Sequence, residues 1–382
     1  MDDYPAGPAS PRPRRPPLSV VIPVHDGGPD FERCLRGLRD STWTDYELIV
    51  VDDGSRDGSA DRAEGFGARV IRSPVRLGPA AARNAGAQAA TGPLVFFLDA
   101  DVALKPDALA RAMARFEADP GLAGLFGSYD DDPSAPGLVS RFRNLLHHYV
   151  HQSGRFVADA RPAHTFWTGC GAIRRDVFVE HGGFDPLLYR RPAIEDIELG
   201  YRITRAGHQI LLARDVQATH LKRWTLPDVI RTDIFRRGVP WLLLMRRSRV
   251  VETDLNVSKT QRAAVAATGL GLLGVPGMLL SPWLLALLPA SLAAIVGLNR
   301  DFYRFLAGRR GPGFAVASIP LHFVYYCCCG ASVLIASALW HLGIARGPSE
   351  PRATPGRRLD PAEAGSSPAP HPPAARRRSP TR

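Results

Sequence analysis

The clearest chemical signature in this sequence is a pair of aspartates one residue apart, Asp99 and Asp101, directly after the apolar run LVFFL at 94–98. Such a run is typical of a strand buried on both faces, and its end delivers the two carboxylates to one place. Carboxylate oxygens suit Mg²⁺ or Mn²⁺. An ion held there could neutralise a diphosphate as a Lewis acid. A solvated loop is the alternative, and the buried strand before the pair makes a metal site an equal possibility.

Polar residues also follow two other apolar runs. The run at 18–23 leads into His25 and Asp26, and the run at 47–51 ends in an Asp-Asp-Gly-Ser segment. Ligands of an open parallel sheet bind outside the carboxyl ends of its strands. The residues that we assign to such a rim are Pro23, Val24, Asp53, Asp99 and Ala100. A carboxylate like that of Asp53 can accept hydrogen bonds from a ribose or base, although an Asp-Gly turn needs no ligand.

These side chains need a scaffold, and the chain around them alternates short β-branched runs with helical patterns. The runs cover 18–23, 47–51, 69–71 and 94–98, and apolar residues recur at helical spacing within 31–38. Strand–helix–strand repeats of this kind predict an α/β fold with a doubly wound, mainly parallel sheet. Neither G-x-G-x-x-G after the first run nor G-x-x-x-x-G-K-[ST] occurs. Glycine-cradled dinucleotides and P-loop nucleotides are therefore disfavoured.

Six motifs occur in order along the chain. They are VVIPVHDG (20–27), ELIVVDDGSRDGS (47–59), LGPAAARNAGAQAATG (77–92), VFFLDADV (95–102), GGFDP (182–186) and EDIELGYRITRAG (195–207). Together they resemble a family 2 glycosyltransferase of the GT-A fold, over roughly residues 18–245. The resemblance implies a Rossmann-like, mainly parallel sheet with flanking helices. It also implies a nucleoside-diphosphate sugar as donor substrate and a divalent metal, Mg²⁺ or Mn²⁺, as cofactor.

The resemblance assigns roles to individual residues of the donor site. Asp53 would bind the nucleotide base, Asp99 the ribose or diphosphate, and Asp101 the metal. Arg83, in the AARN segment, would help to shape the donor pocket. His220 would complete the metal shell or contact the diphosphate. By residue type alone, Arg83 could instead pair with a rim carboxylate, and His220 could be a structural histidine.

The acidic segment at 195–202 would supply the catalytic residues. By resemblance, Asp196 is the catalytic base with Glu195 beside it, and in-line displacement inverts the anomeric centre. A general base contributes about 10²–10⁴-fold to a rate. Without the resemblance, the same acids are simply the negatively charged first turn of a helix.

Two features depart from the usual family pattern. His25 and Asp26 stand where many members have an aromatic residue and Asn, which alters the expected contacts with the base. Processive polysaccharide synthases often show Gln-x-x-Arg-Trp after the acidic segment. The corresponding region here is DIFRRGVPW (233–241), without the Gln. A single-addition enzyme is therefore favoured over a chain-building one.

Two stretches without a charged side chain, 263–299 and 311–345, predict a membrane anchor, since about 20 apolar residues span a bilayer. Residues 222–262 carry ten Lys/Arg against four acids, which marks a cytoplasmic flank near anionic lipids. We expect a multi-pass protein of the cell (plasma) membrane with a cytoplasmic catalytic head and a cytoplasmic loop at 299–310. Two or three spans remain open. A hairpin followed by one crossing would place the basic tail outside, whereas its charge favours the inside.

The sequence thus divides into five regions. They are a disordered leader (1–17), the glycosyltransferase domain (18–245), a basic juxtamembrane segment (246–262), a transmembrane region of two or three spans (263–345) and a disordered, basic, Pro-rich tail (346–382). The fused anchor would hold the active site near amphiphilic molecules. We therefore expect membrane lipids as partners and a lipid, polyprenyl-phosphate or glycan acceptor.

Other functions are less well supported. The formal net charge is +11, but the membrane segments explain the basic flanks, and we expect no nucleic-acid partner. The main alternative is a membrane-tethered protein that binds a nucleotide sugar or glycan without turnover. Intact Asp101 and Asp196 argue against that alternative. The missing glycine fingerprint disfavours a nicotinamide oxidoreductase.

Some cysteines and histidines have both a functional and a simpler interpretation. The run Cys327–Cys329 could be palmitoylated, but apolar packing is favoured. Cys170 is expected to be a small buried residue. His147, His148 and His151 have helical spacing and could bind metal. No carboxylate or cysteine pattern lies near them, so we expect an amphipathic helix near the acceptor groove.

Overall fold

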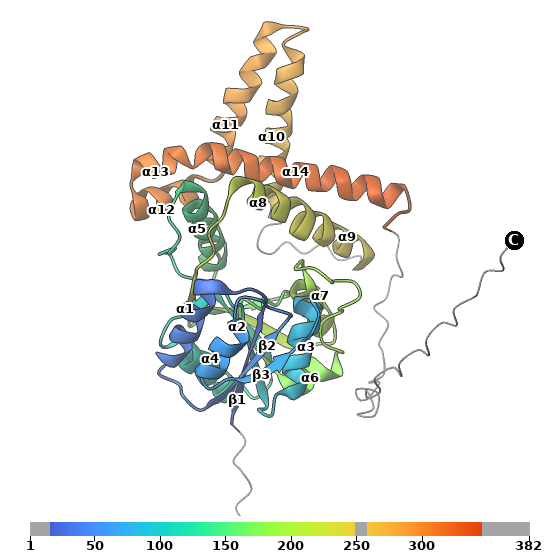
Figure 1. Ribbon diagram of the computed structural model, residues 1–382. Helices are drawn as coiled ribbons and strands as arrows, with labels where there is room; N and C mark the ends of the chain where they lie inside the picture. The colour runs from blue at the N-terminus through green and yellow to red at the C-terminus, as the bar shows by residue number, and fades with distance from the viewer. Residues whose placement is uncertain (1–15, 249–257, 346–382) are drawn as a thin grey trace, which may run out of the picture.

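The computed structural model describes residues 16–248 and 258–345. The tail at 346–382, nearly all of the leader at 1–17 and more than half of the juxtamembrane segment at 246–262 lie outside these residues, and so do the predictions made for them. The described chain forms a sheet domain, a middle layer of helices and a set of C-terminal helices (Figure 1).

Within the described residues, one sheet of nine strands has the order β3-β2-β1-β4-β8-β6-β9-β5, with β7 paired to β9. The strands are β1 (Leu18–Val24), β2 (Tyr46–Asp52), β3 (Arg69–Arg72), β4 (Leu94–Leu98), β5 (Val102–Leu104), β6 (Leu122–Tyr129), β7 (Ala160–Ala163), β8 (Cys170–Arg174) and β9 (Gln209–His220). Strands β3, β2, β1 and β4 are mutually parallel, and β8 runs antiparallel between β4 and β6. All four strands predicted from apolar runs are confirmed, and they form the parallel half of a mixed sheet.

Six helices cover the two faces of this sheet. Helices α1 (Gly28–Arg39), α2 (Ser59–Gly65) and α4 (Ala108–Ala118) pack on one face. Helices α3 (Pro79–Ala89), α6 (Arg175–Glu180) and α7 (Glu195–Arg205) pack on the other. Because successive side chains of a strand point to opposite faces, Val20 enters the first core and Val21 the second. The prediction of a mainly parallel α/β head is confirmed.

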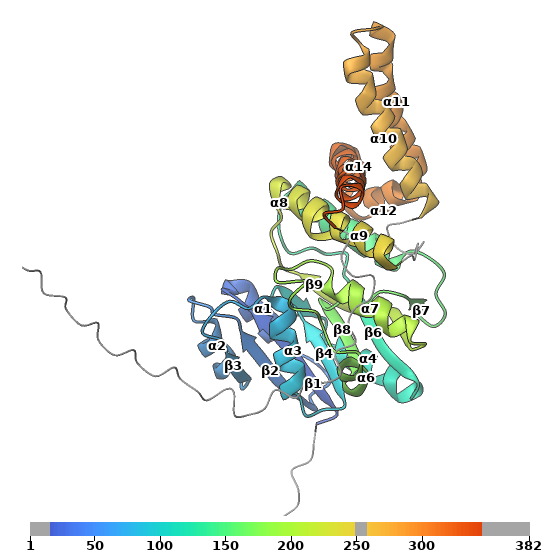
Figure 2. The same cartoon turned by 90° about the vertical axis from the view of Figure 1, so that its right-hand side faces the viewer.

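The remaining helices lie beyond the carboxyl ends of the parallel strands. They are α5 (Leu138–Gln152), α8 (Leu226–Arg231), the π-helix η1 (Thr232–Gly238), α9 (Val239–Ser248), α10 (Lys259–Gly277), the 3₁₀-helix η3 (Pro282–Ala286), α11 (Leu287–Leu298), α12 (Arg300–Arg310), α13 (Pro312–Ala317) and α14 (Ile319–His341). Helices α10 and α11 form a hairpin that projects away from the sheet domain. Helix α14 lies crosswise at the base of this hairpin in both views (Figures 1 and 2).

The segment 299–310 corrects one prediction, because α12 occupies it instead of a loop. Phe302 and Leu306, four residues apart, lie on one face of α12 and are buried. Apolar side chains at that spacing favour an amphipathic helix, and the four arginines of the segment hid this pattern.

A third core joins the head to the C-terminal helices. Phe142 of α5, Phe302 of α12 and Tyr326 of α14 are buried together in it. Two ion pairs add to this contact, Arg309–Asp131 and Arg310–Asp132, each at 2.7 Å. The hairpin therefore has a defined position relative to the head.

One helix among the described residues, Pro312–His341, is long and apolar enough to cross a membrane. A second span is possible only if Pro282–Leu298 and Arg300–Arg310, bent by 77° at their junction, count as one. The structure thus supports one span, or at most two, in the region where two or three were predicted. The support for membrane association by the C-terminal helices is therefore one helix that is long and apolar enough to cross, with the bent pair as a possible second.

Candidate active site

Arg83 joins two acidic segments that lie far apart in the sequence. It belongs to α3, and its guanidinium donates hydrogen bonds to Asp99 Oδ1 at 2.6 Å and to Glu195 Oε1 at 2.8 Å. Asp99 follows β4 and Glu195 begins α7, so the ends of both elements meet at this arginine. Burial lowers the pKa of Arg83, but the charges of Asp99 and Glu195 outweigh burial and raise it above its ordinary value. The guanidinium therefore stays positively charged and holds the two segments together as a clamp through its two hydrogen bonds.

Removing this clamp should destabilise the fold. We expect Arg83→Met to lower the free energy of unfolding by about 3–5 kcal/mol, because Asp99 and Glu195 lose the cation that they share. Arg111 provides the matched control. It also contacts two carboxylates, but its side chain is 47% exposed, so Arg111→Met should cost less than about 1 kcal/mol. Denaturant unfolding followed by circular dichroism compares the two, and equal losses would contradict the role of the buried clamp.

Asp53, at the end of β2, lies beside the start of α3. Its carboxylate accepts hydrogen bonds from the backbone N–H groups of Leu77 at 2.6 Å and Gly78 at 2.8 Å. His25 Nδ1 lies 2.9 Å from the Asp53 carbonyl oxygen, which links the ends of β1 and β2. Asp53 is thus a buried anchor for the loop before α3, and its contact with a nucleotide base stays a prediction.

Asp101 and His220 lie side by side because β5 pairs with β9 and sets Val102 opposite His220. His220 Nε2 is 3.7 Å from Asp101 Oδ2, beyond hydrogen-bond range. The other ring nitrogen, Nδ1, lies 2.8 Å from Asn144 Oδ1. Since an amide oxygen only accepts, this assignment makes Nδ1 the donor and leaves the Nε2 lone pair free toward Asp101. The carboxylate oxygen of Asp101 suits Mn²⁺ or Mg²⁺, and the imidazole nitrogen of His220 beside it is a candidate second ligand.

Asp196 is the second residue of α7, directly after Glu195. Its Oδ1 accepts a hydrogen bond from Ile197 N at 2.9 Å, and its Oδ2 accepts one from Thr168 N at 3.2 Å. Burial, and then the charge of Glu195, raise the pKa of Asp196 to about 6, although Arg83 and the N–H donors act in the opposite direction. A carboxylate with a pKa near the working pH is suited to accept a proton.

Six of the predicted site residues line one cavity of about 620 Å³. They are Arg83, Asp99, Asp101, Glu195, Asp196 and His220. The cavity also extends to α9, α10 and α14, where Leu242, Val265 and Val333 line it. The predicted residues outside its lining are Pro23, Val24, Asp53 and Ala100. The two carboxylate clusters near residues 100 and 196 therefore converge, while the predicted base contacts lie on the β1–β2 side of the rim.

An aromatic wall of the cavity was not assigned to the site from the sequence. His220 stacks on Tyr129 with ring centroids 4.5 Å apart, and Trp167 packs edge-on against Tyr129 at 4.8 Å. His147 and His151, which we predicted on a helix near an acceptor groove, lie on α5 and line the same cavity. No local pattern indicates Trp167, because its loop is placed by the antiparallel pairing of β8 with β4 and β6.

The segment 233–241, which lacks the Gln of processive enzymes, forms η1 and the start of α9. Asp233 accepts two hydrogen bonds from the Arg143 guanidinium of α5, at 3.0 and 2.5 Å. Single π-helical turns are frequent at functional sites. Here η1 brings Arg236 and Arg237 into the lining of the cavity.

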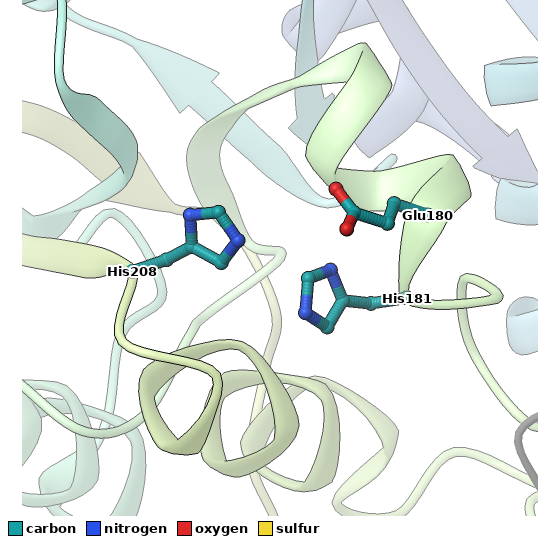
Figure 3. A group of neighbouring side chains, drawn as sticks. All are labelled: Glu180, His181 and His208. Carbon is teal, nitrogen blue, oxygen red and sulfur yellow. The ribbon is translucent and has the colours of Figure 1, made fainter.

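Another group of potential metal ligands lies outside the cavity lining. Glu180, His181 and His208 each place a ligand atom within 4.8 Å of the other two (Figure 3). His181 Nδ1 also lies 2.9 Å from the carbonyl oxygen of Val177. Sequence spacing did not indicate this group, because residue 208 meets residues 180 and 181 only in the fold. An assay of metal binding must therefore distinguish ions bound by Glu180, His181 and His208 from an ion bound at Asp101.

Comparison with known proteins finds relatives of this chain in sequence. Residues 19–182 match the family described as Glycosyl transferase family 2. The uncharacterized protein MT1568 of Mycobacterium tuberculosis is 30% identical over 230 residues, which are 55% of this chain and 71% of that protein. The glycosyltransferase AglE of Haloferax volcanii is 26% identical over 216 residues, which are 54% of this chain and 68% of AglE.

A solved structure shares the fold. The mannosyltransferase PcManGT from Pyrobaculum calidifontis, in complex with GDP-Man and Mn²⁺, superimposes with a TM-score of 0.54. The superposition covers 86% of this chain and 88% of that one at 19% sequence identity. With the ordered motifs and the mixed sheet, these similarities establish that the chain belongs to glycosyl transferase family 2 and has a GT-A head.

Proposed function

We propose that this protein is a membrane-associated, metal-dependent, inverting glycosyltransferase that moves a sugar from a nucleoside diphosphate to a lipid, polyprenyl-phosphate or glycan acceptor. The observation that carries this proposal is the Arg83 clamp, which holds the segments of Asp101 and Asp196 on one cavity. The cavity combines ligands for a cation with a carboxylate of raised pKa. The fold neighbour PcManGT was solved with GDP-Man and Mn²⁺, which supports the same class of donor and metal.

The donor is proposed to lie along the strand ends. Its contacts would come from Pro23, Val24, Asp53, Asp99 and Ala100. Arg83 holds Asp99 in place. Asp101 and His220 would hold Mn²⁺ or Mg²⁺, which when bound supplies Lewis-acid stabilisation of the leaving diphosphate.

Asp196 is proposed as the general base. It accepts the proton of an acceptor hydroxyl while that oxygen forms a bond to the anomeric carbon. The bond between this carbon and the diphosphate oxygen breaks, and the diphosphate leaves with the electron pair. Attack on the face opposite the leaving group inverts the anomeric centre. Glu195, fixed by Arg83, keeps a negative charge beside Asp196 and so helps to keep its pKa raised.

Sugar transfer can be tested with the full-length protein in lipid vesicles, Mn²⁺ and radiolabelled UDP-, GDP- and dTDP-sugars. We expect one nucleotide class to give a labelled product with inverted anomeric configuration. Donor binding without any product would instead support the non-catalytic binding protein.

The C-terminal helices fit a position in a membrane. The α10–α11 hairpin has no charged side chain between residues 263 and 299. At its tip Leu279, Leu280 and Trp283 are 87%, 89% and 86% exposed. A contiguous exposed apolar surface of this kind marks an interaction site. The charge-free part of α10, residues 263–277, extends about 22 Å at 1.5 Å per residue, shorter than a hydrocarbon core of about 30 Å. The hairpin is proposed to enter the bilayer.

Helix α14 then lies along the membrane surface, although its length and composition would also allow it to cross. It runs crosswise at the base of the hairpin (Figures 1 and 2). The carbonyl oxygen of Ala345, after α14, accepts hydrogen bonds from Arg247 of α9. Because a hairpin returns to the side that it left, the head, α12 and Ala345 share one side. Their positive flanks favour the cytoplasmic side.

The hairpin tip can be tested by substitution. We expect Leu279→Ser, Leu280→Ser and Trp283→Ser together to weaken flotation with anionic vesicles at least about tenfold, because each buried apolar side chain contributes about 1.5–3 kcal/mol. The control combines Val157→Ser, Leu187→Ser and Leu188→Ser, three exposed apolar residues of the head. Equal loss in both proteins, or none in either, would show that the hairpin does not bind lipid.

The division of the chain at residues 17, 245, 262 and 345 is retained as part of this proposal. Helix α8, η1 and α9 up to residue 245 belong to the region assigned to the head, but these helices also pack against α14. They connect the catalytic cavity to the helices that face the lipid.

A further inference from the structure

The lining of the cavity has six Lys and Arg side chains against five Asp and Glu side chains. Arg83 is paired with Asp99 and Glu195, and Arg143 is paired with Asp233. The other carboxylates in the lining are Asp101 and Asp196. These are the proposed metal ligand and general base, and within the described residues neither forms a salt bridge with a lysine or an arginine.

Four further cations line the same cavity: Lys222, Arg236, Arg237 and Arg262. Within the described residues, the side chains of Lys222, Arg236 and Arg237 form no hydrogen bond or salt bridge with another side chain or with the backbone, whereas Arg262 has an interaction partner. Lys222 lies over the ring of Trp224, with its nitrogen 4.3 Å from the ring centroid. Burial, and then the charge of Arg143, lower the pKa of Arg237. Partly buried cations without a carboxylate partner are costly, and a bound anion would remove that cost.

The wall of the cavity away from its carboxylates is apolar. Leu242 and Met245 of α9, Val265 of α10 and Val333 of α14 line it. The π-helix that carries Arg236 and Arg237 also lies directly against α14, since a Cβ added to Gly238 would fall 2.2 Å from Ser332 Oγ. Cationic and apolar surfaces therefore adjoin next to the helices proposed to meet the membrane.

We propose that Lys222, Arg236 and Arg237 bind the phosphate of a lipid-linked acceptor whose attacking group is a hydroxyl. The apolar chain of this acceptor would lie between α9, α10 and α14, and the hydroxyl would face Asp196. This inference rests on the proposed function and narrows it. A general base is needed for a hydroxyl but not for an ionised phosphate oxygen, so the phosphate serves for binding and is not the nucleophile.

The position of the cations favours the acceptor over the diphosphate of the donor. Both arginines lie on η1, which packs against α14, whereas Lys222 lies two residues after His220, the proposed metal ligand at the end of β9. The proposed donor contacts lie instead at the ends of β1, β2 and β4. The same phosphate chemistry would recognise either ligand, so the experiment has to measure both.

The test uses the full-length protein in nonionic detergent without donor. Dodecyl phosphate and dodecanol are titrated in parallel, and binding is followed by intrinsic tryptophan fluorescence, since Trp224 and Trp241 line the cavity. We expect dodecyl phosphate to bind at least about tenfold more tightly than dodecanol, and Arg237→Gln and Arg236→Gln each to weaken it about tenfold. Arg223→Gln is the matched control, because Arg223 is exposed, lies beside Lys222 and does not line the cavity.

The same variants are then titrated with the nucleotide sugar and Mn²⁺. Unchanged donor affinity supports the acceptor site, whereas weakened donor binding with unchanged dodecyl phosphate binding would assign the cations to the donor. Equal affinity for dodecyl phosphate and dodecanol would overturn the proposal, and the other arginine variant decides the test if one of the two does not fold. Phosphate binding without any sugar transfer would refute the proposed function and leave this binding site standing.

Discussion

Replacing Asp101 with alanine should reduce kcat/KM for sugar transfer by about 10³-fold or more. The reason is the loss of a proposed ligand to the divalent ion, whose stabilisation of a leaving diphosphate amounts to several kcal/mol. The fold should survive the change, because the Asp101 side chain is 38% exposed. Initial rates with the full-length protein and saturating Mn²⁺ measure the effect, and circular dichroism checks the fold.

Removal of metal should reproduce this loss in the unaltered protein. EDTA is expected to abolish transfer, and Mn²⁺ or Mg²⁺ to restore it. His208→Ala is the matched control, since it disrupts the ligand group of Glu180 and His181 outside the cavity lining and should leave the metal dependence of transfer unchanged. Full activity after complete removal of metal would rule out the role given to Asp101 and His220.

Asp196→Asn should lower kcat about 10²–10⁴-fold, because an amide cannot accept the proton of the acceptor hydroxyl. Asn keeps the shape of the side chain and can still accept a hydrogen bond from Thr168. We therefore expect the affinity for the donor to remain. A variant that loses donor binding as well as turnover would place Asp196 in the donor site instead.

The pH dependence follows from the same residue. A base must be deprotonated to act, so transfer should rise as the pH increases through about 6, the pKa of Asp196, and then level off. The residual activity of Asp196→Asn should not rise with pH in this range. Rates between pH 5 and 8 with a constant metal concentration test it, and an identical rise in both proteins would assign the titration to another group.

Stability should change in the opposite direction to activity. The pKa of Asp196 in the folded protein, about 6, lies above the ordinary value of 3.8. The folded state therefore binds more protons between these pH values, and the free energy of unfolding falls as the pH rises. Asp196→Asn removes this penalty and should be more stable above pH 6, by about 1–2 kcal/mol after the loss of one hydrogen bond. The gain should disappear as the pH falls toward 4.

The parallel half of the sheet could be predicted because its signals are local. Each buried strand is a short run of β-branched or aromatic residues, and the polar residues proposed for the site follow at its end. Asp99 and Asp101 after β4 are the clearest case. That prediction needed only the rule that parallel strands present their carboxyl ends at one edge.

Features that depend on contacts distant in sequence could not be predicted in the same way. The double role of Arg83 requires α3, β4 and α7 to meet, and residue type alone left a single ion pair as the simpler alternative. Trp167 and the π-helix η1 enter the cavity through strand pairing and packing against α14. The helix at 299–310 was missed because its arginines outweighed the spacing of Phe302 and Leu306.

The apolar stretches indicated lipid contact but not its geometry. Composition makes 263–299 and 311–345 equivalent as candidates for spans. The arrangement of a projecting hairpin with α14 crosswise at its base depends on the core shared by α5, α12 and α14. The hydropathy of a stretch of sequence does not predict how its helices pack against one another.

The central claim is that the segments around residues 100 and 196 form one metal-dependent donor site with a separate base. Calorimetric titration of a nucleoside diphosphate sugar into Asp196→Asn, with and without Mn²⁺, tests this most directly. The account predicts binding as tight as in the unaltered protein, lost when EDTA is added or when Asp101→Ala is combined with it. Binding that does not need metal, or no binding of any UDP-, GDP- or dTDP-sugar, would contradict it.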